Sequence, residues 1–94
     1  MQELSQQYLQ ADNRDDWRAA LAVAEQAIAQ YPQDAQAWAM RARAHFMGQN
    51  ARAAQADVTR ALSLDPKCAL AVATDAGLKF DDGLDRLAMA KLDD

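Results

Sequence analysis

The sequence predicts an all-α fold: an α-α superhelix of about two and a half to three helical hairpins. Alanine dominates the apolar residues, while the chain has three Gly and two Pro among 94 residues. Alanine is the best helix former and lets helices approach one another closely. A β-sheet favours β-branched residues, and these are few: Val23, Ile28, Val58, Thr59, Val72 and Thr74. No stretch alternates apolar and polar residues with the period of a strand.

An internal repeat is the second observation behind this prediction. The prolines, Pro32 and Pro66, are 34 positions apart. The same shift superimposes small or apolar residues at helical spacings, including Ala20 on Ala54, Ala27 on Ala61, Trp38 on Val72 and Ala42 on Ala76. Repeats of this length are typical of stacked helical hairpins. We therefore expect one domain, residues 1–94, with units of about 1–34, 35–68 and 69–94, the last degenerate or capping.

The first unit should hold two helices. The first covers about residues 2–11 and ends at the polar stretch 12–14. Asp15 or Asp16 can cap the second helix, because a carboxylate accepts hydrogen bonds from free amides of the first turn. Apolar residues at helical spacing, from Trp17 to Ile28, then mark its inner face. The helix should end at Tyr31, since a following proline disfavours helix.

The second unit repeats this pattern and the third departs from it. Asp34 can cap a helix that runs to about Met47 and ends at Gly48, and Asn50 can cap one that closes at Asp65-Pro66. In the third unit we expect a helix over about 67–79, a break at 81–83 (Asp-Asp-Gly), and a short closing helix from Leu84 to about Leu92. Leu84, Leu87, Ala88 and Leu92 would pack this closing helix on one side.

The unit from Ala35 to Cys68 resembles the tetratricopeptide repeat (TPR). Trp38 occupies the large position of the first helix, Ala42 its small position, Ala54 and Ala61 the small positions of the second, and Pro66 the terminal proline. Residues 17–32 resemble a second TPR helix equally well. Departures include Arg41 for leucine, His45 for tyrosine and Asp75 at a usually apolar position. The resemblance covers nearly the whole chain and is weakest at both ends.

The resemblance implies a concave groove, lined by the first helix of each unit, that takes an extended peptide or a helix. Met40 and Met47 would supply adaptable apolar contacts, and Arg43 the one strong charge. The full set of expected groove residues is Leu9, Gln36, Met40, Arg43, Phe46, Met47, Leu70 and Thr74. An alternative is that Phe46 and a methionine complete the core between units.

Charge and composition argue against several other classes of function. The formal net charge of −4 gives no electrostatic reason to bind nucleic acid. No apolar run is long enough to span a bilayer, and the first residues do not resemble a signal peptide. Cys68 is the sole cysteine, so no internal disulfide is expected. We expect a cytoplasmic chain that binds neither nucleic acid nor membrane.

Catalytic and metal-binding patterns are weak. His45 is the sole histidine and Cys68 lies far from it in sequence, so a nucleophile and base cannot be assembled. Residues 81–85 lack the ligand spacing of an EF-hand. The sequence thus predicts no enzyme, cofactor or metal. It predicts an adaptor or chaperone-like module that binds another protein or peptide; the alternative is a structural module that forms a homo-oligomer through its terminal repeats.

Overall fold

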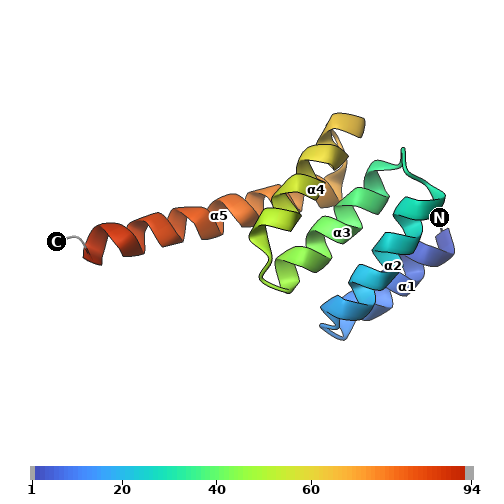
Figure 1. The fold of residues 1–94 in the computed structure, drawn as a ribbon, viewed down its shortest axis with the longest axis horizontal. Helices are drawn as coiled ribbons and strands as arrows, with labels where there is room; N and C mark the ends of the chain where they lie inside the picture. The colour runs from blue at the N-terminus through green and yellow to red at the C-terminus, as the bar shows by residue number, and fades with distance from the viewer. Residues whose placement is uncertain (1, 93–94) are drawn as a thin grey trace.

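A computed structural model describes the backbone of residues 2–92 and the side chains of residues 2–80. Five helices follow one another: α1 (Gln2–Asn13), α2 (Trp17–Gln30), α3 (Ala35–Met47), α4 (Ala51–Leu64) and α5 (Ala69–Leu92) (Figure 1). No strand occurs in the part of the chain so described. The all-α prediction is confirmed.

Three of the predicted N-caps are formed. Asp16 accepts a hydrogen bond from the Ala19 amide at 3.1 Å, and Asp34 accepts one from Gln36 at 2.9 Å. Asn50 accepts one from the Ala53 amide at 3.3 Å. Each bond satisfies an amide that has no partner within its own helix. The polar residues that precede each apolar stretch therefore set where α2, α3 and α4 begin.

Gly48 ends α3 as predicted, but for a different physical reason. Its φ of −82° is accessible to any residue, whereas Gln49, with a φ of 64°, takes the left-handed conformation. Gly48 is required for space instead. A Cβ atom there would lie 2.8 Å from Cε3 of Trp17, so the indole ring of α2 packs directly on this glycine.

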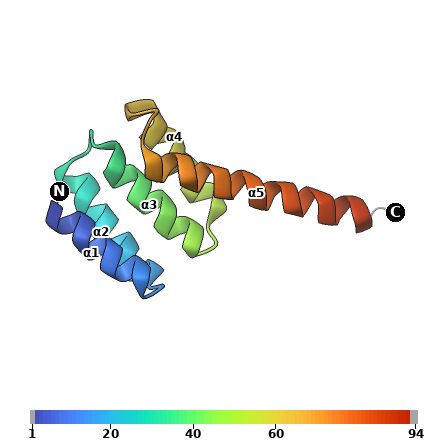
Figure 2. The ribbon, with the colours of Figure 1, turned by 180° about the vertical axis from the view of Figure 1, so that it is seen from behind.

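The helices pack in sequence order around a core made largely of alanine. Neighbours α1 and α2, α2 and α3, and α3 and α4 are in contact, and α5 packs on both α3 and α4. The repeated alanines Ala20, Ala27, Ala54 and Ala61 are fully buried. Figure 1 shows α2 and α4 nearer the viewer, and Figure 2, from behind, shows α1 and α5 in front. Small side chains thus allow the close helix contacts that the repeat predicted.

The predicted break at 81–83 is wrong. α5 is one continuous helix from Ala69 to Leu92, and it projects well beyond the other helices (Figures 1 and 2). A single glycine, Gly83, costs a helix only about 1 kcal/mol, and no proline follows it. The described fold is therefore two hairpins and one long helix. The side chains of Leu84, Leu87, Ala88 and Leu92 lie outside the described residues.

Candidate functional site: the face shared by α1, α3 and α5

Helix α3 contacts both α1 and α5 through one side. The Arg43 guanidinium lies 3.6 Å (Nε to Oδ1) from the carboxylate of Asp12 near the end of α1. One turn further along α3, the Phe46 ring lies over Gly77 of α5, where an added Cβ would be 3.2 Å from it. These two contacts place α1, α3 and α5 in a row, with α3 in the middle.

Four residues around these contacts define what we call the shared face: Leu9, Arg43, Met47 and Ala73. Leu9 precedes Asp12 by three residues and Ala73 precedes Gly77 by four, so each lies on the same side of its helix as that contact residue. Leu9 is 55% exposed and Ala73 is exposed, while Arg43 and Met47 are half-buried. The shared face is therefore accessible, and it carries the apolar side chains of Leu9, Met47 and Ala73 around the Arg43–Asp12 ion pair.

Two predicted groove residues are not on this surface. Met40 is fully buried in a cluster with Leu4 and Tyr8 of α1. Its position lies about 60° around α3 from that of Arg43, and this turn is enough to place it under the packed α1. Thr74 is also buried, and its hydroxyl donates a hydrogen bond of 2.8 Å to the Leu70 carbonyl oxygen. The predicted placement of Met40 and Thr74 in an open groove is wrong.

Phe46 and Leu70 lie between core and surface. Both are half-buried; Phe46 packs against the cluster of Ala42, Ala54 and Val58, and Leu70 against the two neighbouring clusters. This arrangement matches the alternative in which Phe46 completes the core. Both side chains support the edge of the shared face rather than forming its centre.

Gln36 lies apart from the shared face, at the start of α3. Its Oε1 atom is 3.9 Å from the Cys68 sulfur, a long thiol hydrogen bond. It lines an open hollow of about 470 Å³ between the α2–α3 and α4–α5 turns, together with residues such as Asp34 and Lys67. Of the predicted set, helix spacing around the Arg43–Asp12 and Phe46–Gly77 contacts assigns Leu9, Arg43 and Met47 to the shared face, with Phe46 and Leu70 at its edge.

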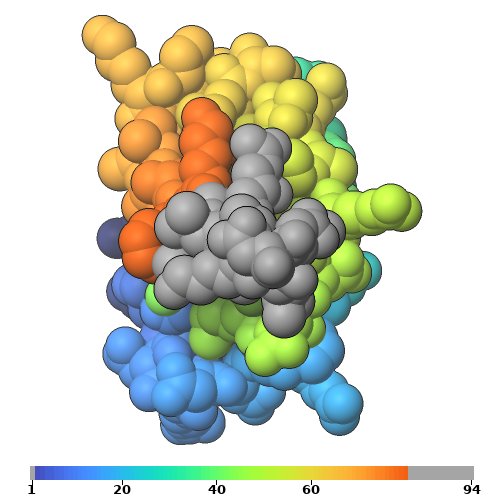
Figure 3. Space-filling view, turned by 90° about the vertical axis from the view of Figure 1, so that its left-hand side faces the viewer, coloured from blue at the N-terminus to red at the C-terminus, as the bar shows by residue number. Residues whose placement is uncertain are grey.

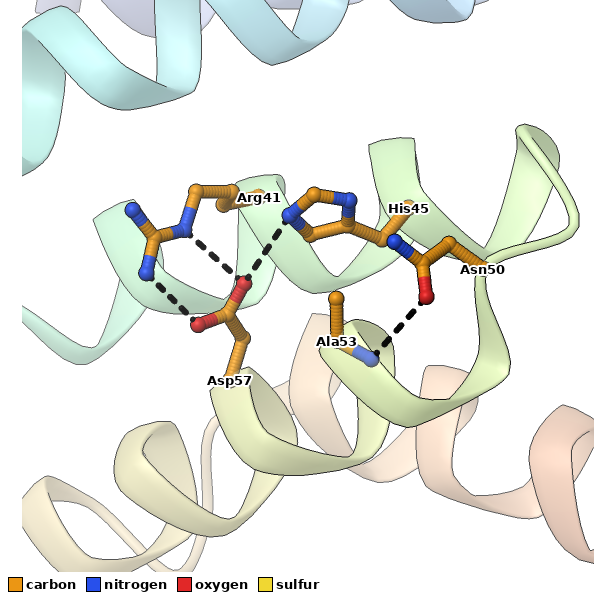
Figure 4. Close-up of polar contacts among 5 residues, drawn as sticks. All are labelled: Arg41, His45, Asn50, Ala53 and Asp57. Atoms are coloured by element: carbon orange, nitrogen blue, oxygen red, sulfur yellow. Dashed lines mark hydrogen bonds and ion pairs between the residues drawn. The ribbon is translucent and has the colours of Figure 1, made fainter.

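A polar cluster between α3 and α4 was missed by sequence reasoning. Arg41 Nε and Nη2 each donate a 2.9 Å hydrogen bond to the buried carboxylate of Asp57, and His45 Nε2 lies 3.7 Å from the same group (Figure 4). The hydrogen bond to Asp57 raises the pKa of Arg41 above its usual value, although burial opposes this. The sequence feature that could have indicated this cluster is Asp57, an acidic residue that stands beside Val58 on the inner face of α4.

This cluster joins two helices and offers no obvious chemistry. The Arg41 guanidinium also lies over the Trp38 ring at 5.0 Å from its centre, and Arg60 lies at 5.6 Å. Cation–π contacts of this kind, like the ion pair, fix side-chain positions. The hydroxyls of Thr59, Ser63 and Thr74 and the thiol of Cys68 donate their hydrogen bonds to groups other than His45. The cluster is best understood as an interhelical clamp.

Tyr8 and the acidic residues of the described chain form no reactive or metal-binding group. Burial, and secondly the charge of Asp12, raise the pKa of Tyr8 well above its usual value, so the hydroxyl stays neutral. Among the described residues, no three His, Cys, Asp or Glu side chains are grouped to hold a metal ion. Within that same part, no helix is long and apolar enough to cross a membrane.

Comparisons with protein-family models, with curated proteins and with solved structures found no match to this chain. The TPR resemblance therefore stays a prediction that depends on the residues named above.

Proposed function

We propose that this chain is a TPR-like, non-enzymatic adaptor or chaperone-like module. It binds another protein, and it holds an extended peptide or an amphipathic helix on the shared face of α1, α3 and α5. The cytoplasmic location expected from the sequence stays a prediction.

The exposed apolar character of the shared face is the observation that carries the proposal. Leu9 is a large apolar side chain that is 55% exposed, and Met47 and Ala73 continue an apolar surface across α3 and α5. Amphipathic helices bind proteins by laying their apolar side into such a surface. Methionine adapts to partners of different shape because its side chain is unbranched and polarizable.

The Arg43–Asp12 pair supports a role in orienting the partner. Its 3.6 Å separation is longer than a good charge-assisted hydrogen bond, and the Arg43 side chain is 38% exposed. A partner carboxylate can therefore bind the free side of the guanidinium without breaking a tight bond. This favours a partner helix or peptide with an acidic residue beside its apolar anchors.

Affinity capture with mass spectrometry tests the proposal. The test variant is Leu9→Ala/Met47→Ala, and the matched control is Val72→Ala, which truncates a comparably exposed side chain away from the shared face. We expect partner proteins that bind the wild type and the control but not the test variant. Identical capture by all three folded proteins would contradict the assignment of the shared face.

A further inference from the structure

The two ends of the helix array differ in polarity. Helix α3 packs on α1 and α2 through three residues that are fully buried, Ala37, Met40 and Ala44. A shift of 34 residues toward the N-terminus leads from these positions to polar residues of α1, all of them exposed: Glu3, Gln6 and Gln10. The α1 end is therefore polar, as the terminal unit of a stack of helical repeats must be.

The α5 end carries apolar residues instead. The α3 residues that pack in clusters with α4 include Trp38, Ala42 and Phe46. The same shift toward the C-terminus leads from these positions to Val72, Ala76 and Phe80. Val72 is 49% exposed, Phe80 is 67% exposed, and Ala76 is exposed as well. Helix α5 thus keeps the apolar residues of this contact, but no helix of the described chain covers them.

Val72, Ala76 and Phe80, which we call the outer stripe of α5, share one side of the helix. Successive members are four residues apart, so each is turned by only about 40° from the one before. The buried residues Thr74 and Leu78 lie about 160° around the helix from Ala76. The space-filling view from the side toward which α5 points shows orange α5 atoms at the surface (Figure 3). The outer stripe therefore points away from the helices on which α5 packs.

A pair of opposite charges lies along one edge of the outer stripe. Asp75 and Lys79 are one helical turn apart, and their side chains are 3.0 Å apart (Oδ2 to Nζ). The Lys79 side chain is 76% exposed, so it can also reach a second molecule. When two α5 helices lie antiparallel about a two-fold axis near Ala76, the same edges of the two stripes face each other with their order reversed. Each Asp75 then faces Lys79 of the other copy.

The apolar residues match under the same operation. The axis near Ala76 places Val72 of one copy against Phe80 of the other, and the two Ala76 side chains against each other. Alanine at the centre lets two helices approach closely, as the buried alanines between α3 and α4 do. The outer stripe is thus complementary to itself in both shape and charge.

We propose that two copies of this chain pair through the outer stripes of their α5 helices, antiparallel about a two-fold axis near Ala76. Each stripe gives the other copy the cover that α4 gives to α3. The polar α1 end of a second copy offers no apolar surface for the stripe, so the copies do not stack head to tail. The contact is reciprocal, and it closes as a dimer.

Cysteine crosslinking tests the pairing directly. In a Cys68→Ser background each variant carries one cysteine, so any disulfide must join two copies. Ala76→Cys places that cysteine near the axis, where the two Cα atoms should lie within the roughly 7 Å that a disulfide spans. The matched control is Ala56→Cys, at an exposed alanine of α4. We expect a covalent dimer from Ala76→Cys under mild oxidation and little from the control; no dimer, or equal amounts from both, overturns the proposal.

Sedimentation equilibrium tests the facing charges. Asp75→Lys gives a copy with two positive charges on this edge, and Lys79→Asp gives a copy with two negative charges. Each variant alone should dimerise about tenfold more weakly than the wild type, because the facing charges repel. An equimolar mixture should recover the affinity of the wild type, since every facing pair in the mixed dimer is attractive.

Two results of this experiment overturn the proposal. One is a mixture that associates no more tightly than either variant alone, because the charges then do not face each other. The other is a wild type that stays monomeric at high concentration, which would leave the outer stripe to a helix of a different protein.

Discussion

Arg41 and Asp57 form a two-pronged ion pair across the α3–α4 hairpin, with both nitrogen–oxygen distances at 2.9 Å. The Asp57 side chain is 6% exposed and that of Arg41 is 28%. Arg41 stands where the TPR resemblance implies leucine, and Asp57 lies beside the buried Val58 on the inner face of α4. The hairpin is thus held in part by a charge contact between buried or half-buried residues. A buried charge that loses its partner is costly, because it has been removed from water without compensation.

Loss of one partner should therefore cost more than loss of both. We expect Asp57→Leu to lower the free energy of unfolding by about 2–3 kcal/mol, below the full cost for a buried pair because Arg41 stays in partial contact with water. The double variant Arg41→Met/Asp57→Leu should lie within about 1 kcal/mol of the wild type. Urea denaturation measures both values. A double variant less stable than the single one would show that the pair itself stabilises the fold.

The buried alanines that recur after 34 residues should not tolerate larger side chains. Ala54 is fully buried between α3 and α4, so Ala54→Leu should overpack the interface and lower the free energy of unfolding by about 1–3 kcal/mol. Ala56→Leu, two residues away on the exposed side of α4, is the matched control and should change stability by less than about 0.5 kcal/mol. Equal effects at the two positions would contradict close packing at Ala54.

Two glycines should respond differently to the same substitution. Gly48→Ala places a methyl group 2.8 Å from the Trp17 ring and should destabilise the fold by about 1–3 kcal/mol. Gly77→Ala meets the Phe46 ring at 3.2 Å, and the gain of up to about 1 kcal/mol in helix propensity should offset most of that crowding. Thermal unfolding ranks the pair. A Gly77→Ala variant less stable than Gly48→Ala would contradict these two ring contacts.

Tyr8 should make the fold sensitive to alkaline pH. Its pKa is raised in the folded state, chiefly by burial, so the unfolded chain releases this proton first. Tyr8 should leave the free energy of unfolding unchanged below the ordinary tyrosine pKa of about 10. Above that pH its contribution should lower the free energy of unfolding by at most about 1.4 kcal/mol per pH unit. Tyr8→Phe has no proton to release and should show a shallower decline between about pH 10 and 11.5. An identical dependence of unfolding free energy on pH in the two proteins would mean that the Tyr8 hydroxyl is exposed to solvent.

Sequence reasoning was strongest where local chemistry decides the structure. Asp16, Asp34 and Asn50 begin their helices because each accepts a hydrogen bond from a nearby amide, and such bonds depend on a few neighbouring residues. The prolines end two helices for an equally local reason. The burial of the repeated alanines could also be predicted, because alanine recurs at equivalent positions 34 residues apart.

The errors concern side-chain direction and long-range partners. Met40 and Arg43 are three residues apart on α3 and differ by only about 60° around the helix, yet Met40 packs in the core and Arg43 is partly exposed. Asp57 contacts Arg41 and His45 because α4 packs on α3. These partners are distant in sequence, so the residues next to Asp57 in the chain do not indicate them. Asp81, Asp82 and Gly83 resemble a turn in sequence, yet α5 continues through them.

The proposed role of the shared face is tested most directly by NMR titration of the labelled protein with a binding peptide selected from a displayed library. The account predicts that amide and methyl shifts change at Leu9, Arg43, Met47 and Ala73. The shifts of Val72 and Lys79, which are exposed on another side of α5, should stay unchanged. Shift changes centred on α2 or α4 and absent from these four residues would contradict it.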